Sequence, residues 1–221
     1  TFSMPLQQPD VFLGKVAGLG GTATIDLASS LGAHSLKDLL VPGLHYYAEV
    51  LDGSAEGQRF DIDEATTSTT TLGIDLASVH NTRSTLPTAL IGSTIAVRAH
   101  WRLADRCPRS LFNATNSQGS ADRVQFMVPG SGNYQTYWLS NQAASTRWVA
   151  STDLSFADTG SARIVDPAEG FFIQPRSNNV QLTLVGQVRS NAFVTKLRQG
   201  VQLIGQGYPS QATPTTRVMT T

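Results

Sequence analysis

The chain has 221 residues, enough for one large β domain or two small ones with a sizeable core. Charged residues make up 14% of the chain, against about 25% in an ordinary soluble domain, and the formal net charge is zero. Charge this balanced argues against nucleic acid or an anionic membrane as partner, and it removes the self-repulsion that keeps copies of a protein apart. No stretch is long and apolar enough to predict insertion into a membrane.

The first residues alternate in the manner of a β-strand. Phe2, Met4 and Leu6 are separated by polar residues or proline, and Pro5 favours a place at the edge of a sheet. We expect this ribbon to pair either with the chain's own segment Gly200–Gly205 or with a neighbouring subunit. The residues leave both alternatives open, because either pairing satisfies the same edge.

Alternating runs rich in β-branched and aromatic residues predict β-strands through the rest of the chain. In chain order they are Thr22–Leu27, His45–Leu51, Arg59–Asp63, Thr70–Leu76, Thr94–Leu103, Arg123–Val128, Thr136–Ser140, Arg147–Ala150, Gly170–Gln174 and Val180–Val188. A short helix is predicted at Ser35–Leu40, where a serine N-cap precedes three leucines and Pro42-Gly43 ends the pattern. Many short strands and little helix predict an all-β fold of the sandwich or barrel type.

A shift in composition divides these strands into two β lobes. We expect an N-terminal strand segment 1–10, a first lobe 11–104, a connecting loop 105–119, a second lobe 120–208 and an extended Pro/Thr-rich tail 209–221. The chain begins with Thr1 in place of Met, which fits an N-terminus left by processing or trimming.

Scattered runs of glycine, apolar strand residues and turns carry a family resemblance. They are Phe2–Leu6, Phe12–Val16, Tyr46–Gly53, Glu56–Gly57, Phe60–Ile62, Gly170–Gln174, Leu182–Val188, Asn191–Phe193 and Gly200–Gly205. In these runs the chain resembles a family of exported, β-rich bacterial surface proteins from Verrucomicrobia-like organisms. The resemblance implies a secreted, extracellular or cell-surface protein with a β fold, and it assigns no functional residue. Many members carry a C-terminal sorting helix; this sequence ends without one, which leaves processing or a different attachment open.

No local motif supports catalysis. The histidines lie far apart without zinc-ligand spacing, and no serine sits in a Gly-x-Ser-x-Gly elbow. No pair among the acidic residues is singled out as a glycosidase pair. Cys107 has no histidine near it in sequence and is expected to be inert. We predict that the protein is not an enzyme and has no catalytic residue, metal ligand or cofactor; a secreted hydrolase is the least supported hypothesis.

Asp61 and Asp63 are the sharpest candidates for binding a cation. They share one strand face, and Asp52 and Glu56 are expected opposite them across a hairpin. The spacing does not match an EF-hand loop, and a solvated strand end is the ordinary explanation. Calcium binding there stays open, as does glycosylation at Asn113.

A β chain with this charge balance suits a structural subunit of an extracellular filament or cell-surface layer. We expect copies to join head to tail by β-strand addition, so that the main partner is a second copy. The predicted interface residues are Phe2, Met4 and Leu6 on the donated strand and Val201, Leu203 and Ile204 beside the acceptor groove. The alternative is a monomeric surface adhesin or carbohydrate-binding module that contacts a glycan through exposed aromatic residues. Trp138 and Trp148 are predicted to belong to the core instead.

Overall fold

The computed structural model describes residues 2–3 (backbone), 5–28, 35–142, 144–167, 169–176, 180–205 and 207–208. Within these residues the chain forms two compact units. Unit 1 contains the residues up to Leu6, Trp101–Val188 and the residues from Arg198 onward, whereas unit 2 contains Gln7–His100 and Arg189–Leu197. The chain therefore passes from one unit to the other after Leu6, His100, Val188 and Leu197.

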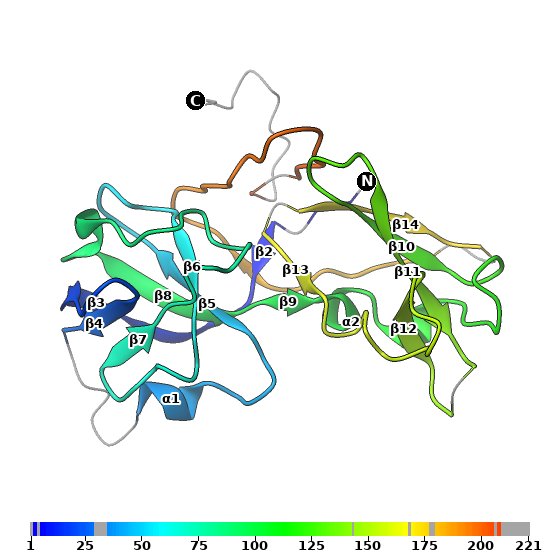
Figure 1. Cartoon of the computed structure of the whole chain (residues 1–221), viewed down its shortest axis with the longest axis horizontal. Helices are drawn as coiled ribbons and strands as arrows, with labels where there is room; N and C mark the ends of the chain where they lie inside the picture. The colour runs from blue at the N-terminus through cyan, green and yellow to red at the C-terminus, as the bar shows by residue number, and fades with distance from the viewer. Residues whose placement is uncertain are drawn as a thin grey trace. The chain divides into compact units, whose positions relative to one another are not determined.

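Unit 2 is built on a six-stranded antiparallel sheet with the strand order β6-β5-β8-β3-β4-β7 (Figure 1). The strands are β3 Asp10–Leu19, β4 Thr24–Leu27, β5 Tyr46–Val50, β6 Arg59–Asp61, β7 Thr71–Gly73 and β8 Thr94–Ala99. The two end strands also meet, because Ile62 and Ile74 form an antiparallel bridge and the N–H of Asp63 donates to the carbonyl of Gly73 at 2.9 Å. The sheet of unit 2 thus curls into a barrel-like shape in which the chain beyond the two end strands meets at this bridge.

Apolar side chains from every strand fill this barrel. They include Phe12, Val16, Ile25, Leu27, Ala48, Val50, Phe60, Leu72, Ile95 and Val97. Helix α1 (Leu36–Leu39) begins at Ser35, whose hydroxyl accepts from the Lys37 N–H in a capping box with Asp38. The 3-10 helix η1 (Thr88–Leu90) adds Leu90 to the core.

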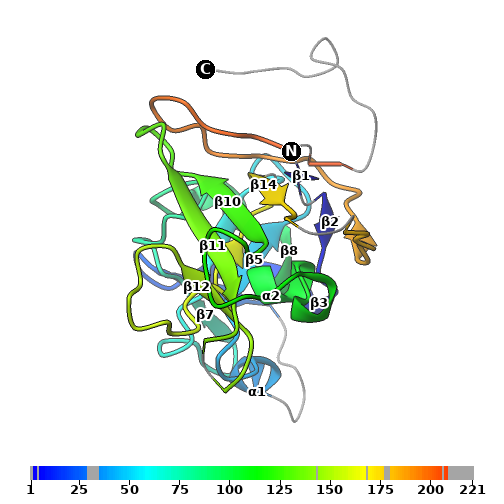
Figure 2. The ribbon, with the colours of Figure 1, turned by 90° about the vertical axis from the view of Figure 1, so that its right-hand side faces the viewer.

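Unit 1 contains a five-stranded antiparallel sheet with the order β1-β14-β10-β11-β12, and the strands of its centre lie side by side in Figures 1 and 2. The strands are β1 Phe2–Ser3, β10 Arg123–Met127, β11 Tyr134–Ser140, β12 Arg147–Ala150 and β14 Gly170–Gln174. Two short ladders join β9 (Trp101–Arg102) to β13 (Ile164–Val165) and β2 (Leu6–Gln7) to β15 (Gln187–Val188). The helices are α2 (Leu103–Arg106) and the 3-10 helix η2 (Arg109–Leu111).

The sheet of unit 1 does not close, and its two edges differ. At the β12 edge, the Gly160 N–H donates to the carbonyl of Trp148 at 2.7 Å, so a loop covers part of that strand. At the other edge, β1 pairs with β14 at two positions, Phe2 opposite Phe171 and Ser3 opposite Gly170. The N-terminal strand is therefore the edge strand of an open sheet.

The all-β fold with minimal helix is confirmed. The predicted strand Thr94–Leu103 is interrupted at His100, where the chain leaves unit 2, and Leu103 begins α2. The segment 105–119, predicted as a connecting loop, contains η2 and contributes Cys107 and Phe112 to the core of unit 1. Its apolar residues become visible as core only once the lobe folds around them.

The prediction of a strand over Val180–Val188 is wrong for most of its length. Only β15 at its end is a strand, and the described residues before it have no regular secondary structure. Val180, Leu182 and Leu184 pack against the core of unit 1, whereas the residues between them are exposed. The alternation therefore reflects burial of one side of the segment and not pairing in a sheet.

Candidate functional site

The start of β14 gathers segments from both ends of the chain, and we call this place the strand junction. Gly170 lies opposite Ser3 in the β1–β14 ladder, and its N–H donates to the carbonyl of Leu203 at 3.1 Å. The preceding residue, Glu169, forms an antiparallel bridge with Ile204. A Cβ at Gly170 would lie 2.6 Å from the Leu203 side chain, so glycine permits this close approach.

At the other end of the N-terminal segment, two side chains bind the backbone carbonyl of Leu6. Its carbonyl accepts from Trp101 Nε1 at 3.0 Å and from Arg106 Nη2 at 3.5 Å. The Arg106 guanidinium lies over the Trp101 ring, 3.1 Å from its centroid, and also donates to the carbonyl of Val185. Burial lowers the pKa of Arg106 to about 10, so the side chain remains cationic at neutral pH. Because Trp101 and Arg106 bind a backbone carbonyl, these hydrogen bonds do not depend on which side chain residue 6 carries.

The six predicted interface residues are placed as follows. Phe2 pairs with β14 through its backbone, whereas its side chain and all of Met4 lie outside the described residues. Leu203 and Ile204 meet β14 at the strand junction, and the Val201 carbonyl accepts from the Gly130 N–H at 3.2 Å. Val201 and Ile204 are 64% and 42% exposed. The structure thus brings Phe2, Leu203 and Ile204 to one strand and places Leu6 and Val201 elsewhere in unit 1.

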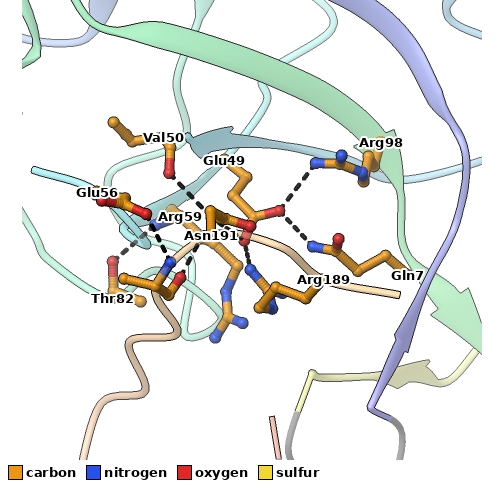
Figure 3. A network of polar contacts seen from close by, with 10 residues as sticks. Gln7, Glu49, Val50, Glu56, Arg59, Thr82, Arg98, Arg189 and Asn191 are labelled. Atoms are coloured by element: carbon orange, nitrogen blue, oxygen red, sulfur yellow. Dashed lines mark hydrogen bonds and ion pairs between the residues drawn. The ribbon is translucent and has the colours of Figure 1, made fainter. Parts of the chain in front are cut away.

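A second candidate site is a buried ionic network in unit 2, shown in Figure 3, which the sequence did not predict. Its centre is Glu49 on β5, which is 0% exposed. One carboxylate oxygen, Oε2, accepts from Arg98 Nη1 at 2.9 Å and from Gln7 Nε2. The other, Oε1, forms an ion pair with Arg189 and accepts from Asn191 Nδ2 at 3.4 Å. The network joins two strands of the barrel to residues that are far away in sequence.

We call the segment Arg189–Leu197 the strap. It binds the rest of unit 2 through several kinds of contact. The Ala192 N–H donates to Glu56 Oε1 at 2.7 Å. The ring of Phe193 lies 5.1 Å from Arg59 Cζ and 4.9 Å from Arg189 Cζ, in cation–π geometry. A Cβ at Gly57, where φ is +82°, would lie 2.6 Å from the Ala192 carbonyl oxygen. The turn at Gly57 therefore makes room for the strap.

The electrostatics of this network fit a structural role. Burial raises the pKa of Tyr47, and the nearby Arg59, Arg189 and Arg98 offset part of that rise, so the phenol stays neutral. Both oxygens of Glu49 already accept hydrogen bonds, and the carboxylate is shielded from water. A carboxylate so occupied is poorly placed to act as a general base or to receive a substrate.

Asp61, His100 and Ser78 form a third polar cluster in unit 2. His100 Nε2 lies 2.8 Å from Asp61 Oδ1, and the Ser78 hydroxyl donates to Asp61 Oδ2 at 2.6 Å. In a hydrolytic triad the histidine stands between the serine and the carboxylate, whereas here the carboxylate stands between the other two. The histidine therefore cannot take the serine proton, and the arrangement is not a nucleophilic triad.

The Asp61 cluster predicts a pH dependence of stability. Burial by itself would raise the pKa of Asp61, but hydrogen bonds from His100 and Ser78 and the attraction of His100 bring the pKa below its ordinary value of 3.8. A carboxyl whose folded pKa is depressed adds stability above its unfolded pKa and loses it as the pH falls through the folded pKa. We expect Asp61→Asn to lower the free energy of unfolding at pH 7, with the difference from the wild type shrinking below pH 3.8. Urea unfolding at a series of pH values measures this; a difference that is independent of pH would contradict it.

The calcium candidates do not converge. Asp61 is occupied by His100 and Ser78, and Asp52 accepts from the N–H and hydroxyl of Thr94 at 2.7 Å. Among the described residues, no three acidic, histidine or cysteine side chains are grouped as metal ligands.

Trp138, Trp148 and Cys107 are buried. Trp138 and Trp148 are 3% and 0% exposed, which confirms their predicted place in the core. Cys107 is buried, and burial raises the pKa of its thiol to about 12, so it is a poor nucleophile.

No family model, curated protein or solved structure matches the chain. Within the described part of the chain, no helix combines the length and the apolar character needed to cross a membrane.

Proposed function

We propose that the protein is a non-catalytic structural subunit of an extracellular filament or cell-surface layer, whose copies join by exchanging the N-terminal strand. One observation carries the proposal: Phe2 and Ser3 form the edge strand of the unit 1 sheet, although the chain enters unit 2 a few residues later, at Gln7. A terminal strand that fills the edge of another compact unit makes the same contacts whether that unit belongs to its own chain or to the next one.

The sheet edges of the two units indicate β14 as the strand that accepts an exchanged segment. The ends of the unit 2 sheet meet at a bridge, and a loop covers part of β12, so the strand that accepts an exchanged N-terminal segment is β14, which β1 covers in this structure. There β1 covers Gly170 and Phe171, two of the five residues of β14. Donation of the N-terminal segment to a neighbour is a head-to-tail contact, which extends into a polymer when its rotation does not close a ring. The zero net charge favours such association.

The polar clusters support a role without catalysis. Glu49 is saturated with donors, Asp61 separates Ser78 from His100, and the thiol of Cys107 is buried and protonated. The Glu49 and Asp61 clusters connect strands of unit 2 to other segments of the same unit, which fits a structural subunit.

Disulfide trapping between two populations tests strand exchange. One population carries Phe2→Cys and the other Phe171→Cys; these positions face each other in the antiparallel β1–β14 ladder, within the separation that a disulfide spans. On mixing under mild oxidation we expect disulfide-linked heterodimers on a non-reducing gel, because an exchanged strand places the cysteines of two chains together. The native Cys107 is buried and does not compete. Negatively stained preparations of the unsubstituted protein are expected to show regular fibres.

The matched control is a mixture of Phe2→Cys with Leu154→Cys, since Leu154 is 86% exposed and belongs to no strand of the sheet that β1 joins. Cross-linking equal to that of the first mixture would show random collision. Circular dichroism verifies that Phe171→Cys, a substitution in the core, retains the fold. Isolated particles without heterodimers would overturn the proposal and favour the monomeric adhesin or carbohydrate-binding module.

A further inference from the structure

We infer that Glu49 is a positioning residue that fixes the root of the N-terminal strand and the root of the strap together, one on each side of its carboxylate. Gln7, where the N-terminal strand enters unit 2, donates to Oε2. Arg189, where the strap enters unit 2, pairs with Oε1. Figure 3 shows the two side chains approaching the same carboxylate.

The strands that lead to these two residues are themselves paired. Gln7 is the last residue of β2, and Arg189 directly follows β15, the partner strand of β2. A third donor, Arg98 on β8, binds Oε2 at 2.9 Å and anchors the carboxylate to the wall of the barrel. The carboxylate is thus fixed by one barrel residue and shared by two chain segments that enter unit 2 side by side.

Sharing one buried carboxylate couples the two segments. Glu49 is 0% exposed, so its charge is stabilised by its hydrogen-bond donors and not by water. When one donor leaves, the cost of keeping the remaining charge buried rises, and the other donor is held less firmly. Coupling of this kind is reciprocal: loosening the N-terminal strand loosens the strap, and loosening the strap loosens the N-terminal strand.

The coupling matters for exchange of the N-terminal strand, so this step rests on the proposed function. An exchanging strand leaves unit 1 as far as Leu6, while Gln7 stays on Glu49 and serves as its pivot. Glu49 thereby sets the direction in which the strand leaves and ties the strand to a second segment of its own subunit. Tension on a donated strand would pass through this carboxylate into the strap.

Hydrogen–deuterium exchange on the full-length protein tests the coupling. We expect Glu49→Gln, which keeps the shape and removes the charge, to speed exchange in peptides covering residues 2–7 and 189–194 together, by at least about tenfold. Exchange in β4 and β7, neither of which adjoins β5 in the sheet, is expected to change much less. The matched control is Asp61→Asn, another buried acid on the neighbouring strand β6. It is expected to affect the surroundings of His100 and neither of the two segments.

A second pair of variants carries the test if Glu49→Gln does not fold. Gln7→Ala should speed exchange in 189–194, and Arg189→Lys should speed exchange in 2–7, each without a matching change in β4 and β7. A change confined to the substituted segment, or one spread evenly over unit 2, would overturn the inference. Because exchange is measured within single chains, this result is independent of the disulfide trapping: heterodimers can fail to form while the coupling holds, and the reverse.

Discussion

Replacing Glu49 with alanine is expected to lower the free energy of unfolding by about 3–5 kcal/mol, because it leaves buried cations without their counter-ion. Arg98 and Arg189 are 7% and 4% exposed, so Arg98 regains water only if the sheet is disrupted and Arg189 only if the strap detaches. Urea unfolding followed by circular dichroism measures the change. All three tryptophans lie in unit 1, so tryptophan fluorescence reports that unit alone, and we expect it to shift less than the dichroism.

Two controls separate the charge from the side chain's bulk. Glu64→Ala removes a half-buried acid outside the network and should change the stability by less than about 1 kcal/mol. The triple variant Glu49→Met, Arg98→Met and Arg189→Met removes all three charges of the two ion pairs at once. Because apolar residues of similar volume can replace a buried ionic group with little loss, it should recover much of the stability. A loss below about 1 kcal/mol for Glu49→Ala would show that the network contributes little.

Period-two alternation was sufficient to predict the all-β fold, because burial of one strand face is written directly into the sequence. Barrel closure in unit 2 was not predictable in this way. It depends on the bridge between Ile62 and Ile74 and on the order in which strands pair, neither of which leaves a local signal. The strand β3 was missed for a related reason: Gly14 and Gly18 interrupt its alternation, and a bulge near Gly18 shifts its register.

The burial of Glu49 could not be predicted from the alternation of apolar and polar residues. In Tyr46–Val50 the pattern places Glu49 on the face opposite Ala48 and Val50, which suggests contact with solvent. All five residues of the strand are buried in the structure, since Gln7 and the strap cover the second face. The available signal was a single acid within an apolar run of a chain poor in charge, and that signal does not name its partners.

The strand junction shows the opposite case, in which the segment was identified and its partner was not. The alternation of the N-terminal ribbon predicted an edge strand, and β1 is one. Its neighbour is β14, whereas the sequence offered the segment Gly200–Gly205, which meets β14 at Gly170. Both segments have the composition of an edge strand, and only the tertiary arrangement decides which lies beside which.

Trp148→Ala is expected to destabilise the protein by about 3–5 kcal/mol, as large core truncations do. The indole is 0% exposed; its Nε1 donates to the Cys107 carbonyl at 3.0 Å, and its ring meets Phe112 edge-on with centroids 5.3 Å apart. The substitution leaves a cavity and a buried carbonyl without this donor, and the two costs add. Urea unfolding followed by circular dichroism measures the loss, and Tyr134→Ala, at a side chain 44% exposed, is the control expected to remain within about 1 kcal/mol of the wild type. Because Cys107 and Phe112 lie in the segment 105–119, a loss comparable to the control's would mean that this segment is a loose connector after all and not part of the core of unit 1.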